Sequence, residues 1–317
     1  MRSQGAFGVV LVSICVWIWG GQFVVGKSAL AHVDAFHLST VRYGISVLGL
    51  MALLAWREGW RALAPGPQIV RLAVLGTLGF ALFNLLAYTG LEHAQPQTAA
   101  LITALAPFLT TFILWGRTGE RPAGTTFATL ALALFGVSLV IGRGHPLSLF
   151  SGALGWGEVL VFAGVLSFTL YTLGGVDVVD FSPLRYTTVT AALGWIPLAL
   201  ATVVADEAGW IGSPSLGDYR DVWLQILYLA VPGAIVAMIA WNSAVVLIGA
   251  QNVALFWSTI PVATFAIQIA RGYRPHALEL VGAAITVGAL IGLNLLNRRR
   301  ARRELARLPG LGATEPA

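Results

Sequence analysis

The sequence contains very little charge. Only 10% of its 317 residues are Asp, Glu, Lys or Arg, whereas 57% are hydrophobic and the mean hydropathy is +0.80. A water-soluble chain needs roughly a quarter of its residues charged to cover its surface. A soluble globular protein is therefore excluded, and lipid must solvate much of this chain. Since a membrane helix needs roughly 20 mainly apolar residues, the long apolar runs predict an all-α integral membrane protein.

Cysteine and metal-binding motifs are equally scarce. The single Cys15 lies in an apolar run, which excludes an internal disulfide bond. No Asp-rich motif and no His-Glu-x-x-His motif occurs in the sequence, so the convergent acid–base or metal groups of a membrane-embedded enzyme are not expected. We therefore expect no catalytic residues, no cofactor and no metal, and we predict that the protein is not an enzyme.

The net charge of +5 does not indicate nucleic-acid binding, because the positive residues are concentrated in one terminal segment. This segment contains Arg298, Arg299, Arg300, Arg302, Arg303 and Arg307. Positive residues next to a last membrane helix typically stay on the cytoplasmic side. We predict that residues 298–317 form a basic, disordered cytoplasmic tail.

Apolar runs separated by polar residues, Gly or Pro predict ten membrane helices. Their approximate ranges are 7–27, 35–55, 69–90, 97–116, 124–142, 153–174, 184–205, 222–247, 252–270 and 277–297. An arrangement of nine spans stays open if the third or the eighth run is buried without crossing. The connections are short, except for 56–68 and 206–221, so consecutive helices should pack as antiparallel neighbours.

The distribution of Lys and Arg predicts the orientation. With both termini inside, the cytoplasmic side holds Arg2, Arg57, Arg61, Arg71, Arg117, Arg121 and the six arginines of the tail. The outer side then holds Lys27, Arg143, Arg220, Arg271 and Arg274. This excess on one side predicts cytoplasmic termini and a bacterial-type inner (plasma) membrane location.

The two halves of the chain match each other at a shift of 154 residues. The identical pairs are Gln97 with Gln251, Ala100 with Ala254, Leu101 with Leu255, Pro107 with Pro261, Thr110 with Thr264, Ile113 with Ile267 and Arg117 with Arg271. The fourth span thus corresponds to the ninth, and each half holds five helices. We predict two five-helix repeats, residues 1–145 and 146–297.

An odd number of helices inserts the second repeat in the opposite orientation. This explains why the basic loop at Arg117 faces the predicted cytoplasm while its copy at Arg271 faces outward. Inverted repeats are a recurrent plan of secondary transporters, in which rocking of the halves alternates access to a central site. The sequence therefore predicts a transporter.

Several short segments, in this order, resemble the ten-helix EamA-type exporters of the drug/metabolite transporter superfamily, which include exporters of aromatic amino acids. The similar segments are Trp17-Ile18-Trp19-Gly20, Arg42, residues 84–107 with Tyr88-Thr89-Gly90-Leu91 inside, Ala240-Trp241-Asn242-Ser243-Ala244, Ile248-Gly249-Ala250-Gln251 and Pro261. The resemblance covers residues 7–297. It implies a central cavity lined by helices 1, 3, 4, 6, 8 and 9 and export of amino acids or other metabolites, without fixing the substrate.

Aromatic and uncharged polar residues within the spans are the candidates for substrate binding. Such groups in a membrane usually face a cavity or another helix, and an apolar pocket with a few polar groups suits a small molecule. The alternative is that they bond neighbouring helices or pack against lipid. The candidates are Trp19, Gln22, Asn84, Tyr88, Ser167, Tyr171, Trp241, Asn242 and Trp257.

Two prolines and two ionisable residues complete the candidates. Pro107 and Pro261 lie in the middle of equivalent spans, where a proline kinks a helix and could act as a hinge or as a static bend. Arg42 lies about eight residues into its span and needs a carboxylate, a carbonyl or the substrate as partner. Glu158 is expected five or six residues inside the sixth helix, where it could carry a coupling proton or reach the interface.

We predict a secondary transporter that exports small neutral metabolites, hydrophobic or aromatic amino acids foremost, by alternating access. A channel-like facilitator and an exporter of drugs or other metabolites are the alternatives. The expected partners are a small-molecule substrate and the lipid bilayer, without nucleic acid. A monomer is compatible with the sequence, which leaves the oligomeric state open.

Overall fold

The computed structural model describes residues 2–141, 145 and 155–305, and within them all regular structure is helical. The first half contains α1 (Arg2–Ala29), α2 (Ala35–Glu58), α3 (Ile69–Gly76), η3 (Thr77–Leu82), α4 (Phe83–His93), α5 (Pro96–Thr103), α6 (Ala106–Thr118) and α7 (Gly124–Ile141). The second half contains α8 (Trp156–Gly175), α9 (Pro183–Glu207), α10 (Leu216–Asp221), α11 (Trp223–Ala230), η5 (Val231–Val236), α12 (Ala237–Ile248), α13 (Ala250–Ala254), η6 (Leu255–Thr259), α14 (Ile260–Ala270) and α15 (Ala277–Leu305). Short 3-10 helices, η1 (Trp60–Leu63) and η2 (Gly66–Gln68), follow α2.

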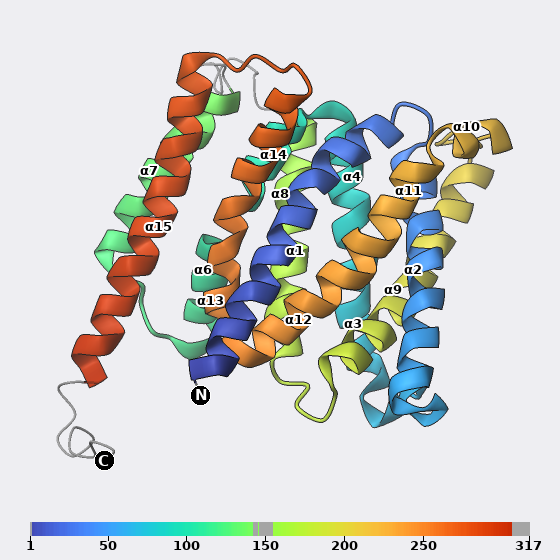
Figure 1. Ribbon diagram of the computed structural model, residues 1–317, viewed down its shortest axis with the longest axis horizontal. Coiled ribbons are helices and arrows are strands. Elements are labelled where there is room, and N and C mark those ends of the chain that lie inside the picture. Colours follow the sequence, from blue (N-terminus) through green and yellow to red (C-terminus); the bar gives the residue numbers. More distant parts are fainter. Residues whose placement is uncertain (1, 142–144, 146–154, 306–317) are drawn as a thin grey trace.

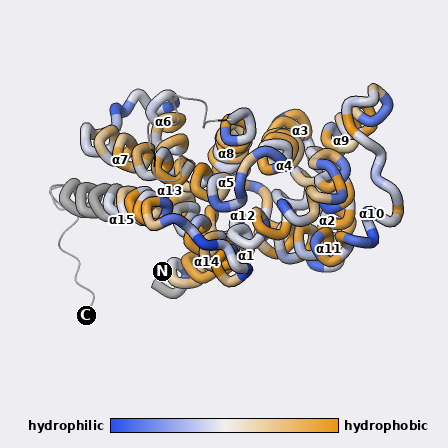
Figure 2. The backbone as a smooth tube through the Cα atoms, turned by 90° about the horizontal axis from the view of Figure 1, so that it is seen from above, coloured by the Kyte–Doolittle hydropathy of each residue, from blue (hydrophilic) through white to orange (hydrophobic). Residues whose placement is uncertain are grey.

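Eight of the described helical runs are long and apolar enough to cross a membrane, some of them assembled from consecutive segments such as α3, η3 and α4. Two shorter apolar helices lie at Gly124–Val140 and Ala277–Ala289. Figure 2 shows hydrophobic residues along most of the helices. The prediction of an all-α membrane protein is confirmed, while the number of ten spans stays a prediction.

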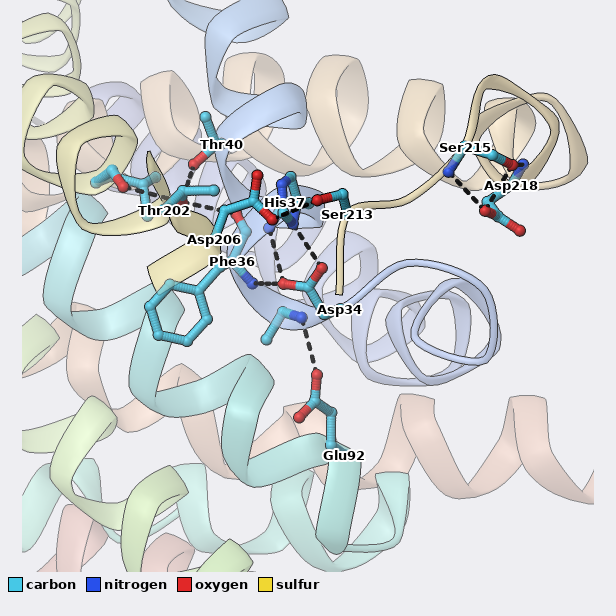
Figure 3. Close-up of polar contacts among 12 residues, drawn as sticks. Asp34, Phe36, His37, Thr40, Glu92, Thr202, Asp206, Ser213, Ser215 and Asp218 are labelled. Carbon is cyan, nitrogen blue, oxygen red and sulfur yellow. Dashed lines mark hydrogen bonds and ion pairs between the residues drawn. The ribbon is translucent and has the colours of Figure 1, made fainter. Parts of the chain in front are cut away.

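Side chains at one end of the bundle cap the helices there (Figure 3). Asp34 precedes α2, and its carboxylate accepts the backbone N–H groups of Phe36 at 2.9 Å and His37 at 3.1 Å. Glu92 of α4 accepts the N–H of Ala35 at 2.8 Å. Two acidic groups thus satisfy the exposed donors at the start of α2, where the helix dipole also favours negative charge.

The two halves of the chain interleave in the bundle (Figure 1). The first helix, α1, packs against α11, α12 and α14 of the second half, and α8 packs against η3 and α4 of the first. α2 pairs with α9, and α7 pairs with α15 at one edge of the molecule. Close approach of α4 and α8 depends on glycine, because a Cβ atom on Gly157 would lie 2.7 Å from the carbonyl oxygen of Gly90.

A π-helical turn interrupts the same predicted helix in each half. η3 lies between α3 and α4, and η5 lies between α11 and α12. Thr77 and Val231, their first residues, are 154 positions apart, as are Leu82 and Val236, their last. π turns leave backbone groups without regular helical partners and are frequent at functional sites.

Two predictions about local structure need correction. α15 continues through Leu305, so the first part of the 298–317 tail is helical; its Arg, Ala, Glu and Leu residues are good helix formers that extend the preceding span. Glu158 lies in the first turn of α8 and not five or six residues inside it, because the helix begins at Trp156. Residues 306–317 of the tail and all but residue 145 of the segment 142–154, where the two predicted repeats meet, lie outside the described residues.

Pro107 and Pro261 do not kink continuous helices. Each is the second residue of a new helical segment, α6 or α14, and the chain before it leaves the α-helical path. α5 ends at Thr103, and the 3-10 segment η6 precedes α14. A proline in a first helical turn removes no intrahelical hydrogen bond. Each proline therefore lies just after a break in the α-helix and does not bend a continuous helix.

Candidate functional site

Five aromatic side chains pack together at the centre of the bundle, and we call them the aromatic cluster: Trp19, Phe168, Tyr171, Trp241 and Trp257. Trp19 of α1 lies 5.1 Å from Trp241 and 5.5 Å from Phe168, ring centroid to centroid. Phe168 lies 5.3 Å from Trp257 and 5.4 Å from Tyr171. These distances are typical of edge-to-face and tilted aromatic pairs. The cluster joins both halves of the chain, since Trp19 comes from the first and the others from the second.

Uncharged polar groups hold two rings of the aromatic cluster, those of Trp241 and Tyr171. The indole N–H of Trp241 donates to Thr172 Oγ1 at 3.2 Å. Asn242 Nδ2 donates to the hydroxyl of Tyr171 at 2.9 Å and to Thr187 Oγ1 at 2.8 Å. The three predicted residues Tyr171, Trp241 and Asn242 are therefore brought together by hydrogen bonds between α8, α9 and α12.

The cluster encloses little space in this conformation. A cavity of about 10 Å³ is lined by Ala106, Thr110, Phe168, Thr169, Thr172, Trp241, Ala254 and Trp257. Such a volume holds about one water molecule, so no solute fits without movement. The indole Nε1 of Trp257 is buried and has no hydrogen-bond partner. The structure is thus a closed conformation with one unused donor beside its central cavity.

Side chains of α1 and α8 contact the two π turns. The indole N–H of Trp19 donates to the carbonyl oxygen of Gly233 in η5 at 3.0 Å, and Gln22 packs against the same glycine. Ser167 Oγ donates to the carbonyl oxygen of Leu78 in η3 at 2.7 Å. Each bond crosses between the halves of the chain and satisfies a carbonyl group in a π turn.

Asn84 and Tyr88 belong to a second group, which also contains Arg42. Arg42 Nη2 donates to Asn84 Oδ1. The Arg42 guanidinium carbon lies 4.4 Å from the ring centroid of Tyr88 and 4.7 Å from that of Tyr43, within the range of cation–π contacts. Together with Ser39, one helical turn before Arg42, we call these residues the Arg42 cluster.

Asn84 and Tyr88 were predicted to lie with the aromatic candidates, and no sequence pattern indicated Phe168, Phe80 or Tyr43. Phe80 in η3 lies 5.5 Å from Tyr171 and 5.4 Å from Tyr43, ring centroid to centroid, so it joins the two clusters. Phenylalanines in a membrane helix carry no polar signal that separates them from lipid-facing residues. Phe168 could have been found only because it neighbours Ser167, a predicted site residue.

Glu158 is separated from both clusters. Its carboxylate accepts the backbone N–H of Gly155 at 3.1 Å and closes the start of α8. This contact is a helix cap. Glu158 thus caps the start of α8 and lies away from the centre of the bundle, so its predicted role in proton coupling has no support from this contact.

A polar hollow of about 240 Å³ lies at the end of the bundle where α1, α5 and α14 meet. It is lined by Val24, Lys27, Ser28, Gln95, Pro96, Gln268 and Arg271. Lys27 Nζ donates to the backbone carbonyl oxygens of Leu91 at 2.6 Å and Glu92 at 2.7 Å. These bonds hold the ammonium group near the helix ends, where water can reach it.

A bundle of membrane-spanning helices with aromatic and polar side chains gathered at its centre is the architecture of a small-molecule transporter. The sequence model of the EamA-like transporter family matches residues 6–142 and again residues 155–295. The chain belongs to the EamA-like transporter family, and it is a multi-pass membrane transporter. The predicted resemblance is confirmed.

Several relatives are named as transporters, and two of them match this chain over nearly its whole length. The uncharacterized transporter YrdR of Bacillus subtilis is 28% identical over 302 residues, which cover 94% of each protein. The "Probable terminal-alkyne amino-acid exporter" of Streptantibioticus cattleyicolor is 27% identical over 94% of this chain and 99% of its own. The S-adenosylmethionine/S-adenosylhomocysteine transporter of Chlamydia trachomatis serovar L2 is 28% identical over 49% of this chain and 48% of its own. A protein of known crystal structure shares the fold with a TM-score of 0.66 at 19% identity, over 94% of this chain and 97% of its own.

Proposed function

We propose that the protein exports small neutral metabolites with an apolar or aromatic part, hydrophobic or aromatic amino acids foremost, by alternating access. The observation that carries this proposal is the aromatic cluster between the two halves, whose polar neighbours Thr172, Thr187 and Asn242 are uncharged. Aromatic rings stack on apolar side chains, with about 0.5–1.5 kcal/mol for each offset or edge contact. Hydroxyl and amide groups orient the polar end of a zwitterion.

Two observations support alternating access between two inverted halves, residues 1–145 and 146–297. The π turns η3 and η5 occupy positions 154 residues apart, the same shift that aligns the sequences of the halves. The family match also falls into two segments of similar length, residues 6–142 and 155–295. In this mechanism the halves rock about the aromatic cluster and open it to one side at a time.

The amino-acid exporter among the relatives supports the substrate class, because its similarity extends over nearly all of both chains. The relative that transports S-adenosylmethionine and S-adenosylhomocysteine supports it more weakly, since the similarity covers half of each chain. Both of its solutes contain an amino-acid moiety.

Counterflow in proteoliposomes tests the function. Vesicles loaded with unlabelled phenylalanine should accumulate labelled phenylalanine transiently, because a carrier exchanges solute on a reorienting site while a channel only equilibrates it. Threonine and a sugar nucleotide serve as comparison solutes. Saturable exchange of the sugar nucleotide without exchange of amino acids would contradict the substrate class, and uptake without counterflow would favour a facilitator.

We further infer that both termini face the cytoplasm. The start of α1 and the end of α15 lie on the same side of the bundle (Figure 1), and the basic residues of the sequence favour the inside for that side. Cysteine labelling in whole cells, after replacement of Cys15, tests the orientation. A Gly212→Cys variant should react with an impermeant reagent, and an Arg61→Cys variant should react only after permeabilisation; the reverse pattern would overturn the orientation.

A further inference from the structure

Arg42 is a charged side chain enclosed within the protein. It lies in α2, within the apolar span Ala35–Glu58, and only 1% of it is exposed. The guanidinium group remains protonated in proteins. Removal of such a charge from water costs several kcal/mol unless an opposite charge and hydrogen bonds offset it. A buried arginine in a membrane span therefore needs a group that compensates its charge, either in the protein or in a bound solute.

The described residues give Arg42 no charged partner. One nitrogen, Nη2, donates to the neutral amide oxygen of Asn84, and two tyrosine rings lie against the guanidinium. Nε and Nη1 are buried and have no hydrogen-bond partner. The ion pairs within the described part of the chain are His37–Asp34 and Arg71–Asp177, and neither includes Arg42. The positive charge of Arg42 thus has no counter-charge among the described residues.

A second polar group next to Arg42 also lacks a partner. Ser39 lies three residues before it on the same face of α2. The hydroxyl of Ser39 is buried, its residue is 0% exposed, and it makes no hydrogen bond. Buried polar groups are nearly always paired with protein or with ordered water, and water supplies no counter-charge to a buried guanidinium. Two adjacent groups that can donate, one of them charged, therefore indicate a ligand that accepts hydrogen bonds and carries negative charge.

We propose that Arg42 binds the carboxylate of the transported solute, with Ser39 as a second donor. This proposal rests on the proposed function and narrows it to solutes with a carboxylate, so amines and alcohols of the same shape are poor substrates. Asn84 and Tyr88 of α4 cover the guanidinium in the closed conformation. The carboxylate reaches it when α2 and α4 separate, and it then exchanges for the amide of Asn84.

The number of buried cations limits the charge of the solute. Arg42 is the only buried Lys or Arg side chain among the residues whose burial is described. Lys27 is bonded to backbone carbonyl groups near the end of its helix. A second carboxylate or a diphosphate on the solute would be buried without a counter-charge, which is costly. The solute therefore carries one carboxylate.

Binding to the purified protein tests this assignment directly. The probes are phenylalanine, phenylacetate, which lacks the ammonium group, and phenylalaninamide, which lacks the carboxylate. We expect phenylalanine and phenylacetate to raise the thermal stability of the wild type in a saturable way. Phenylalaninamide should need a concentration about 10- to 100-fold higher, since the lost hydrogen bonds are charge-assisted.

Matched variants separate charge from shape. Arg42→Gln keeps a donor and removes the charge, and it should weaken the binding of phenylalanine about 10- to 100-fold. Arg42→Lys restores the charge and should recover part of this loss, while Ser39→Ala should cost a severalfold loss. Arg61→Gln, an exposed arginine in η1, is the control and should bind as the wild type does.

Each outcome decides the proposal. Equal binding of phenylalanine and phenylalaninamide by the wild type would overturn it even if no Arg42 variant folds. Unchanged phenylalanine binding and exchange in folded Arg42→Gln would overturn the carboxylate site and leave the proposed function intact. Phenylacetate binding that depends on Arg42, in a protein that does not exchange phenylalanine, would support the site and contradict the amino-acid function.

Discussion

The aromatic cluster and the Arg42 cluster are both buried, yet they satisfy their polar groups to different degrees. Around Tyr171, Trp241 and Asn242 every donor that joins the helices has an acceptor within 3.2 Å. Around Arg42 three polar atoms, Ser39 Oγ, Arg42 Nε and Arg42 Nη1, have none. Apart from the indole Nε1 of Trp257, the protein itself satisfies the donors of the first cluster, whereas the second cluster lacks an acceptor with negative charge.

This difference separates two contributions to solute binding. The closed aromatic cluster, in which only Trp257 Nε1 lacks a partner, stabilises the bundle and supplies apolar contact area once it opens. An unpaired buried cation destabilises the closed state and gains most when an anion arrives. Substitutions in the aromatic cluster should therefore lower stability and affinity together, and substitutions in the Arg42 cluster should separate the two.

The largest effect is expected from Trp241→Ala. Trp241 is 1% exposed and contacts Trp19, Phe168 and Trp257. Truncation of a buried Trp leaves a cavity and costs about 3–5 kcal/mol. We expect a clear loss of thermal stability in detergent and a severalfold weaker affinity for phenylalanine in proteoliposomes.

Trp156→Ala is the matched control, because Trp156 is 80% exposed at the start of α8. It should change stability little. Unchanged phenylalanine affinity in folded Trp241→Ala would contradict a role of the aromatic cluster in binding.

Asn84→Asp should separate stability from binding. The substitution places a carboxylate where the Asn84 amide already contacts Arg42, so the buried cation gains a permanent partner. We expect higher thermal stability than in the wild type together with weaker binding of phenylalanine, because the new carboxylate competes with that of the solute. A charge-assisted hydrogen bond contributes about 1.5–3 kcal/mol, which sets the scale of both changes.

Asn84→Leu is the counterpart and should lower stability, since it removes the remaining side-chain acceptor of Arg42. If Asn84→Asp instead lowered stability as much as Asn84→Leu, the hypothesis that Arg42 lacks a negatively charged partner would be contradicted.

Sequence patterns predicted the membrane class and family because both depend on long apolar runs and on the order of several motifs. Four of the residues predicted to bind substrate, Trp19, Tyr171, Trp241 and Trp257, lie in one cluster in the structure, and their role in binding stays a prediction. The separation of Asn84 and Tyr88 from these residues was not predictable. It depends on α2 packing beside α4, a contact between segments far apart in the chain that no local pattern encodes.

The local errors have similar physical causes. Glu158 was placed deep in a helix because an apolar run does not show where its first turn begins, and the cap at Gly155 decides that. The tail was assigned to disorder from its charge, although charged residues with good helix propensity can extend an existing helix at little cost. Both errors concern helix ends, where hydrophobic periodicity carries least information.

A smaller effect is expected from Thr172→Val in the aromatic cluster. Thr172 Oγ1 accepts the hydrogen bond of Trp241 Nε1 at 3.2 Å. Valine keeps the shape of the side chain and leaves the indole donor unpaired, which costs about 1–3 kcal/mol. We expect a moderate loss of thermal stability and a proportional loss of affinity for phenylalanine, in contrast to the opposite changes in Asn84→Asp. A gain in stability on this substitution would contradict the conclusion that the hydrogen bonds of the aromatic cluster stabilise the closed protein.

The smallest change in stability is expected from the prolines. Pro107 and Pro261 are second residues of α6 and α14, positions at which proline replaces no intrahelical hydrogen bond. Pro107→Ala and Pro261→Ala should therefore shift the free energy of unfolding by less than about 1 kcal/mol, mainly through the entropy of the unfolded chain. If the prolines act as hinges, they limit the backbone conformations at the breaks Ala104–Leu105 and η6. Each variant should then slow counterflow, while its affinity for phenylalanine stays that of the wild type. Pro197→Ala, at a proline inside α9, is the control for a static bend. Full exchange rates in both hinge variants would leave the prolines as fixed features of the helix starts and would assign the movement to other segments, the π turns η3 and η5 first among them.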